Sequence, residues 1–477
     1  MKRGKKLIIL LLVLVLAIAA ALIVQAIVTK NEEAATEAED TSVTFLTIDP
    51  DAITALSWTY NDETANLAYA SGVWTDADDA AFPVAQTYPD AMATALEAVT
   101  ATRSFDAEDL SEYGLDAPAY TVTVTTDAET TLTIGSASEI SGEYYTSIGD
   151  GKVYLVDSAL LDPFTYGLSD ILQMETVPDM SALTGIDITT GTGEANLLYL
   201  ENSDYSYSDQ YHWFLLQNGA YKALGSAADT FADSLTGLSW ISCESYNATD
   251  EELAAYGLDA PNATLILSYT EAADADSDAE AAEATFVLEI GGFTDGGYYA
   301  RIQGSRMVYL IDASLAQSIL GVSYDTLQPT DVCLLDWDTV TSFDVTLDDA
   351  TYTFAKNTRD ITDADGNVTQ ETYYTMNGAE VDADRVTAIY DSIYGMSSNG
   401  TTDQAPGAVE IAFAFHRSTA AFTDIDLVFY RSNSTSCIVG FDGETGLTVA
   451  RSDVVDLIET VNAILLDQTS TTEAEAE

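Results

Sequence analysis

The chain has 477 residues, enough for about three domains, and its 47% hydrophobic residues are sufficient to form globular cores. Its 78 acidic residues against 16 basic ones give a formal net charge of −62. A surface this acidic repels phosphate groups, so we exclude nucleic-acid binding. The cysteines Cys243, Cys333 and Cys437 have no CxxC spacing, and we expect three buried thiols, with one disulfide plus a free thiol as the alternative.

The first 30 residues predict a membrane anchor. Four basic residues precede an unbroken apolar run from Leu7 to Val24, and only Lys30 follows it. A helix of this length can cross a bilayer, and the positive-inside bias leaves its start in the cytoplasm. The alternative is a cleaved signal peptide, for which the run is longer than usual. We expect residues 1–30 to form a single-pass signal anchor in the cell membrane, with the bulk of the chain extracytoplasmic.

Two polar segments flank the remaining chain. Residues 31–42 are rich in alanine and glutamate, and residues 467–477 have a similar composition. Neither segment can bury enough apolar surface to order itself. We therefore expect a disordered linker at 31–42 and a disordered acidic tail at 467–477.

Between these segments the sequence repeats itself. The hexapeptide YGLDAP at 113–118 recurs letter for letter at 256–261, and KVYLVDSAL at 152–160 corresponds to MVYLIDASL at 307–315. A third unit opens with a similar segment at 340–343 but has QAP in place of the hexapeptide. We interpret this as a tandem duplication with repeat domains at 43–174 and 180–330 and a degenerate third repeat at 338–466.

Each unit begins with strands of alternating character, continues with an amphipathic helix, and ends with strands rich in β-branched residues. This pattern predicts tandem α+β domains with mainly antiparallel sheets, placed after one transmembrane helix. The second unit carries an acidic insert at 271–284, which we place in a hairpin loop. The buried helix faces are predicted to consist of Met92, Leu96 and Val99, of Phe231, Leu235 and Leu238, and of Val386, Ile389 and Ile393.

The repeated hexapeptide is typical of a helix end. Gly114 and Gly257 suit the left-handed conformation that ends a helix, and the proline that follows cannot continue it. Thr249 and Glu252 would form a capping box at the start of the second of these helices. The residues of this structural motif are Tyr113, Gly114, Leu115, Pro118, Tyr256, Gly257, Leu258 and Pro261.

No reaction is indicated by the sequence. His212 and His416 both lie in strand-like runs without a nucleophile motif, and we assign no catalytic, cofactor-binding or metal-binding residue. The segment 363–367 resembles a calcium loop, but required carboxylates are missing, so a hairpin turn is the better interpretation. Trp74, Trp213 and the pair at 373–374 occupy equivalent strand positions, which favours core packing over a glycan platform.

The basic start, the YGLDAP turn, the glycine after the next strand, the paired tyrosines and the VYLVD strand together make the chain resemble bacterial proteins of the domain-of-unknown-function 4340 family. The resemblance implies a membrane-anchored extracytoplasmic protein, often encoded beside ABC-transporter permeases of the gliding-motility type. It supplies no catalytic residues. We expect a non-enzymatic accessory component of an ABC-type transport complex. The alternatives are a cell-surface module that binds cations or glycan, with diffuse cation association at its acidic surface, and a hydrolase with an unrecognised site.

Overall fold

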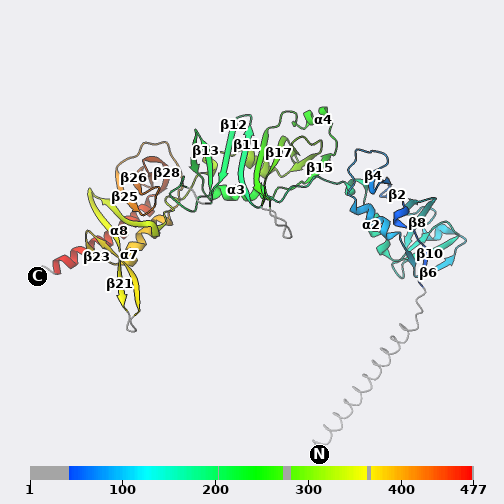
Figure 1. Cartoon of the computed structure of the whole chain (residues 1–477), viewed down its shortest axis with the longest axis horizontal. Helices are drawn as coiled ribbons and strands as arrows, with labels where there is room; N and C mark the ends of the chain where they lie inside the picture. Colours follow the sequence, from blue (N-terminus) through cyan, green and yellow to red (C-terminus); the bar gives the residue numbers. More distant parts are fainter. Residues whose placement is uncertain (1–41, 202–203, 272–280, 363–366, 475–477) are drawn as a thin grey trace, which may run out of the picture. The chain divides into compact units, whose positions relative to one another are not determined.

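The computed structural model describes residues 42–201, 204–271, 281–362 and 367–474, and these form two compact units, one ending at Glu175 and one beginning at Thr176. The first unit contains one large sheet and the second contains two (Figure 1). We call each large sheet with its helices a repeat, numbered 1 to 3 along the chain. The prediction of repeated α+β units with mainly antiparallel sheets is confirmed at this level.

The predicted signal anchor at 1–30 and nearly all of the linker at 31–42 lie outside the described residues. Among the helices that the structure describes, none is both long enough and apolar enough to cross a membrane.

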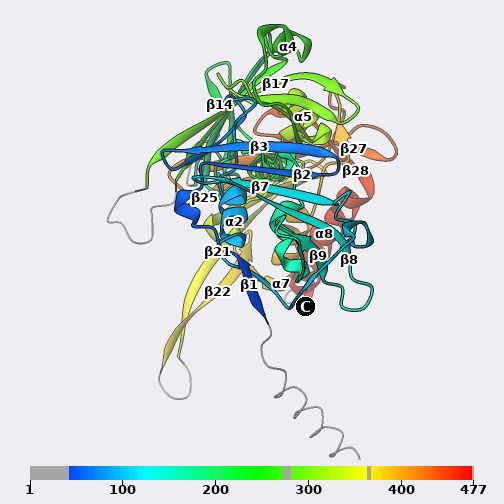
Figure 2. The ribbon, with the colours of Figure 1, turned by 90° about the vertical axis from the view of Figure 1, so that its right-hand side faces the viewer.

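Repeat 1 is a meander of three strands joined to a second meander of four, and an eighth strand lies at the edge of the second meander. Its strands are β2 (Ala55–Tyr60), β3 (Glu63–Ala70), β4 (Val73–Asp76), β6 (Arg103–Asp106), β7 (Tyr120–Thr125), β8 (Glu129–Ala137), β9 (Tyr144–Ser147) and β10 (Lys152–Val156). Their order in the sheet is β4-β3-β2-β7-β8-β9-β10-β6, and β2, β3 and β7 run side by side (Figure 2). A separate ribbon pairs β1 (Val43–Leu46) with β5 (Val99–Ala101).

The remaining elements of repeat 1 are α2 (Thr87–Ala95) and the 3-10 helices η1 (Pro50–Ala52), η2 (Leu110–Tyr113), η3 (Ser158–Leu160), η4 (Asp162–Phe164) and η5 (Leu168–Ile171). Met92 and Leu96 are fully buried, as predicted. The placement of Val99 on the same helix is wrong, because the helix is capped at Leu96 and the β-branched Val99 pairs with β1.

Repeat 2 has the same arrangement with one more strand. Its strands are β11 (Leu183–Thr190), β12 (Gly193–Tyr199), β13 (Trp213–Gln217), β14 (Ala220–Ala223), β15 (Ser242–Ser245), β16 (Ala263–Thr270), β17 (Glu283–Thr294), β18 (Gly297–Ile302) and β19 (Val308–Ile311). Their order is β14-β13-β12-β11-β16-β17-β18-β19-β15. Its helices are α3 (Ser226–Thr236), α4 (Asp250–Ala255), α5 (Ala313–Leu320) and α6 (Tyr324–Leu327). Most of the acidic insert lies between β16 and β17, which pair as a hairpin, and residues 283–284 begin β17.

Repeat 3 repeats this topology although it lacks the hexapeptide. Its strands are β20 (Val340–Leu347), β21 (Ala350–Thr362), β22 (Val368–Met376), β23 (Ala379–Val381), β24 (Gly400–Thr401), β25 (Val409–Arg417), β26 (Asp424–Arg431), β27 (Ser436–Phe441) and β28 (Glu444–Ala450). Their order is β23-β22-β21-β20-β25-β26-β27-β28-β24. Its helices are η6 (Trp337–Thr339), α7 (Ala383–Tyr394) and α8 (Arg451–Ala474).

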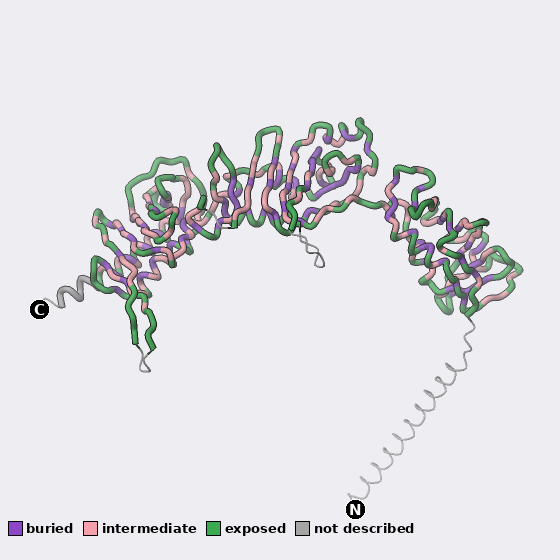
Figure 3. The backbone as a smooth tube through the Cα atoms, in the orientation of Figure 1, coloured by how far each residue is buried: buried purple, intermediate pink, exposed green. Residues whose placement is uncertain are grey.

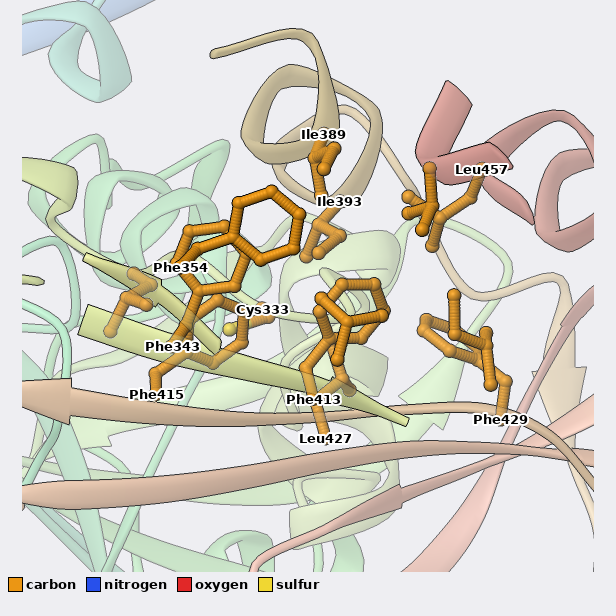
Figure 4. Packing of buried hydrophobic residues seen from close by; sticks show 14 of the residues in the cluster. Cys333, Phe343, Phe354, Ile389, Ile393, Phe413, Phe415, Leu427, Phe429 and Leu457 are labelled. Atoms are coloured by element: carbon orange, nitrogen blue, oxygen red, sulfur yellow. The ribbon is translucent and has the colours of Figure 1, made fainter. Parts of the chain in front are cut away.

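The core of repeat 3 lies between its sheet and the helices α7 and α8. Aromatic side chains from the central strands, among them Phe343 and Phe413, face Ile389 on α7 and Leu457 on α8 (Figure 4). Val332 and Cys333 belong to the same core, so the predicted boundary at 338 begins this repeat too late. The segment before η6 belongs to repeat 3 because the side chains of Val332 and Cys333 pack in its core.

Helix α8 corrects the prediction for the C-terminus. Its helical residues continue to Ala474, so the expected disorder at 467–477 is wrong for 467–474. A buried stripe at Val454, Leu457, Val461 and Ile464 fixes the helix on the core, and neither glycine nor proline follows to end it. Arg385 on α7 also pairs with Asp467 at 2.9 Å, which holds the end of the stripe.

We predict that Leu457→Ala destabilises the second unit by about 2–5 kcal/mol, because it removes a fully buried side chain and leaves a cavity. The matched control is Leu466→Ala on the same helix, where the side chain is 71% exposed and little should change. Urea unfolding of the full chain measures both variants. Equal midpoints for the two variants would contradict the packing of α8 on the core.

Candidate functional site

The hexapeptide of repeat 1 packs against the neighbouring strand β8, and we call this contact between the turn and the strand the clasp. Helix η2 begins after Asp109, whose side chain accepts a hydrogen bond from the Ser111 amide at 3.0 Å. It ends at Gly114, which has a φ of 71°, so the predicted left-handed conformation is confirmed. The Tyr113 carbonyl then accepts a hydrogen bond from the Ser136 hydroxyl at 3.1 Å. The turn is thereby tied to strand β8.

Repeat 2 builds the same clasp from a longer helix. The capping box predicted at Thr249 and Glu252 is present at the start of α4. The hydrogen bonds that the Glu252 carboxylate accepts from the amide and hydroxyl of Thr249 lower its pKa. Gly257 has a φ of 71°, and the Tyr256 carbonyl accepts a hydrogen bond from the Gly292 amide at 2.7 Å.

A glycine on the strand is what allows the tyrosine carbonyl to approach. A Cβ atom at Gly135 would lie 2.1 Å from the Tyr113 carbonyl oxygen, and one at Gly291 would lie 2.3 Å from that of Tyr256. Both glycines occupy bulges, where the pairing register of β8 and β17 shifts. The sequence has a glycine at this position in both copies, and the close approach of the tyrosine carbonyl explains why glycine occurs there.

The other motif residues pack around the clasp. Leu115 and Leu258 are buried, whereas Pro118 and Pro261 are half-buried and precede β7 and β16. In repeat 2 the Leu258 carbonyl accepts a hydrogen bond from Arg301, which also pairs with the buried Glu289 at 2.6 Å. The structure therefore brings together all the motif residues of each copy as parts of the packing.

The main feature that the sequence did not reveal is a tyrosine that joins repeats 2 and 3. Tyr207, in the connection between β12 and β13, packs against the core of repeat 3. Its hydroxyl accepts a hydrogen bond from the Leu334 amide at 3.1 Å, and its ring lies 4.6 Å from that of Phe441. Burial raises the pKa of Tyr207 well above its usual value. The Gln210 side chain also donates to the Tyr394 hydroxyl at 3.0 Å.

No feature of the sequence of residues 200–212 separates a docking segment from an ordinary polar loop. Its run of tyrosines is the one available signal, since tyrosine combines a large apolar ring with a polar end. The partner surface on repeat 3 comes from three separate stretches of chain, which only the folded structure assembles.

Three of the aromatic positions discussed above are buried as predicted: Trp74 is 3%, Trp213 4% and Tyr374 6% exposed. The cysteines differ from the prediction at one position. Cys333 and Cys437 are buried, and burial raises their pKa values to about 12 and about 11, so both stay protonated thiols. Cys243 is only half-buried, because it lies on the edge strand β15.

The histidines lie in different surroundings. His212 is half-buried just before β13, and its ring lies 5.7 Å from that of Tyr199. His416 lies on β25. Its Nδ1 forms a hydrogen bond with Oδ1 of Asp424 at 2.7 Å, and its Nε2 lies 3.7 Å from a carboxylate oxygen of Asp344. The hydrogen bond to Asp424, together with the charge of Asp344, raises the pKa of His416.

Within the described ranges, no group of three or more histidine, cysteine or acidic side chains is arranged to hold a metal ion. A groove of about 770 Å³ lies beside α3 and α5 in repeat 2. Its walls are mostly apolar or hydroxyl-bearing, with Phe231, Leu315 and Val322 among the lining residues, and they also include Asp312 and Gln317.

Taken together, the described chain is a tandem α+β protein in which one antiparallel sheet topology occurs three times. The family model described as "Domain of unknown function (DUF4340)" matches residues 74–197 and 213–410. The chain belongs to this family, and the match includes parts of all three repeats. No match to the chain is found among curated proteins or among solved structures.

We predict that Gly291→Ala destabilises repeat 2 by about 1–3 kcal/mol, because the added Cβ would force the clasp open. Gly191→Ala in the same repeat is the matched control, since its Cβ would have no heavy atom within 4 Å. Thermal melting of the full chain compares them. A melting curve for Gly291→Ala that overlays the control would show that the clasp is not a packing device.

We also predict that the stabilisation of repeat 3 by His416 decreases as the pH rises. Because its pKa is raised on folding, the stabilisation is complete below its unfolded pKa of about 6.5 and is lost as the pH rises through the folded-state value. The side chain is 41% exposed, so solvent screening limits the effect to less than about 1 kcal/mol. Melting of His416→Asn against the unsubstituted chain at pH 5 and pH 8 tests this. An equal difference at both pH values would contradict it.

Proposed function

We propose that this protein is a membrane-anchored extracytoplasmic scaffold without enzymatic activity that assists an ABC-type transport complex. The observation that carries the proposal is the junction at Tyr207, where one repeat binds the surface of the next through an inserted aromatic side chain. This geometry is a protein–protein contact within one chain, with an aromatic anchor and polar contacts around it.

The sequence supports a location in the cell membrane and a membrane protein as the partner. The apolar run from Leu7 to Val24 supports anchoring in the cell membrane, with the sheet repeats outside. The family resemblance supports a permease as the neighbouring membrane protein. Alanines at 17 and 19–21 offer a small-residue patch where a permease helix would approach closely.

We predict that an ABC permease co-purifies with the tagged full chain in mild detergent. Replacing Ala17 and Ala21 together by phenylalanine should reduce its recovery, because the larger side chains keep a neighbouring helix away. The control places phenylalanine at Leu10 and Leu14, within the same apolar run but outside the alanine patch.

Three results decide the proposal. Loss of the permease only in the alanine variant supports contact through the anchor. Equal recovery of the permease with all variants contradicts that contact and leaves the repeats as the docking surface. Failure to recover a permease with the unsubstituted chain contradicts the assignment to a transport complex.

A further inference from the structure

The loop between β8 and β9 in repeat 1 presents a large apolar side chain entirely to solvent. Ile140, within this loop, is 99% exposed, the highest value among the large apolar side chains that the structure describes. Figure 3 shows the connections between the strands of repeat 1 largely as exposed chain. A half-exposed apolar side chain on a surface needs no explanation, but a fully exposed isoleucine leaves its whole apolar area in water.

Hydrogen bonds within the loop hold Ile140 in this position. Ser138 is buried, and its hydroxyl accepts hydrogen bonds from the amides of Ile140 and Ser141, both at 3.4 Å. The Ser138 amide donates to the Glu143 carbonyl at 2.7 Å, and the Ser138 carbonyl accepts from the Gly142 amide at 2.9 Å. An ordered backbone therefore presents the isoleucine, and a preorganised contact loses little conformational entropy on binding.

The described chain enters repeat 1 at the same end. Val43, the first residue of β1, pairs with Ala101 and is 46% exposed. The residue after Ala101, Thr102, donates a hydrogen bond from its hydroxyl to the carboxylate of Glu143, the last residue of the loop that contains Ile140. The exposed loop and the point of chain entry therefore lie at one end of the repeat.

This end of repeat 1 is acidic around its apolar side chains. The stretches 107–112 and 137–143 contain five acidic residues and no basic one, and Arg103 at the start of β6 is exposed at the same end. The first stretch includes part of η2, which the clasp holds against β8 and whose Leu110 is 38% exposed. We use the name entry face for the following set: Val43, Leu110, Ile140 and the two acidic stretches.

The predicted anchor would keep the entry face close to the membrane. The predicted linker at 31–42 has twelve residues and spans at most about 43 Å when fully extended. A tether raises the effective concentration of the groups nearest its attachment point, which here is Val43. A contact that is weak between free molecules is then occupied in the anchored protein. This step rests on the proposed function, because it needs the anchor.

We propose that the entry face binds the extracytoplasmic surface of the membrane protein that the anchor accompanies, with Ile140 in an apolar pocket whose rim carries lysine or arginine. Basic groups around an apolar contact are the complement of an acidic face. The same charge argues against the bilayer itself as the binding partner, because anionic lipids attract basic segments and repel acidic ones. Under the proposed function this membrane protein is the ABC permease.

Repeat 2 supplies a matched control for the loop. Phe293 is 60% exposed at the end of β17, beside the connection to β18 that is equivalent to the loop of repeat 1. Phe45 of β1 stacks on Tyr154 at 4.0 Å, whereas in repeat 2 Trp240, from the segment after α3, stacks on Tyr309 at 4.2 Å. An internal segment thus takes the place of the chain entry, so the proposal predicts binding through repeat 1 and not through this connection of repeat 2.

The test uses the full chain in mild detergent and the permease that co-purifies with it. Ile140→Asp should raise the apparent dissociation constant in microscale thermophoresis at least about tenfold, because a carboxylate is costly to bury in an apolar pocket. Glu139→Lys and added salt should also weaken binding. The controls are Phe293→Asp and Glu129→Lys, the latter at the opposite end of β8, and both should bind like the unsubstituted chain. All four side chains are exposed, so thermal melting should show that each variant folds.

A second measurement locates the contact. A benzophenone amino acid at position 140 of the anchored chain should crosslink to the permease, and the same group at position 293 should not. Recovery of the permease with crosslinks from position 140 to lipid alone overturns this inference and leaves the proposed function standing. Unchanged binding by Ile140→Asp, or an equal loss in Phe293→Asp, has the same consequence. Failure to recover a permease with the unsubstituted chain overturns both.

Discussion

Each repeat depends on one long-range pairing, which joins the first strand of one meander to the first strand of the next. The pairs are β2 with β7, β11 with β16 and β20 with β25. Apolar residues stand opposite each other in this register: Ile186 faces Leu267, and Phe343 faces Phe415, all of them buried. A slip of one residue would turn these side chains to the other face, so the buried face fixes the register.

The clasp at YGLDAP stabilises this pairing in repeats 1 and 2. The crossing segment between the meanders must reach the strand that starts the second meander, and the tyrosine carbonyl makes contact with the bulged strand beside it. Glycine at the bulge removes the Cβ that would block this contact. Repeat 3 keeps the topology without the hexapeptide, and the long helix α8 covers its core.

Much of the local structure could be predicted from the sequence because it follows from local physical constraints. The left-handed glycines, the capping box at Thr249, the hairpin around the acidic insert and most residues of the buried helix faces depend on a few adjacent residues, whereas Leu238 is buried but lies beyond the end of α3. Errors arose where a distant segment decides the outcome. Val99 lies outside the helix because it pairs with β1, and α8 is held on repeat 3 because the core covers its apolar residues as far as Ile464.

The sequence by itself determined that this chain contains repeated antiparallel α+β units with a glycine-dependent turn, since periodicity and letter-for-letter repetition are local and visible. Only the tertiary structure decided that Tyr207 docks on repeat 3 and that the hairpin of β21 and β22 extends past the strand β20. Both outcomes depend on surfaces assembled from segments far apart in the chain. Their complementarity is a property of packing in three dimensions, which no spacing of residues along the sequence encodes.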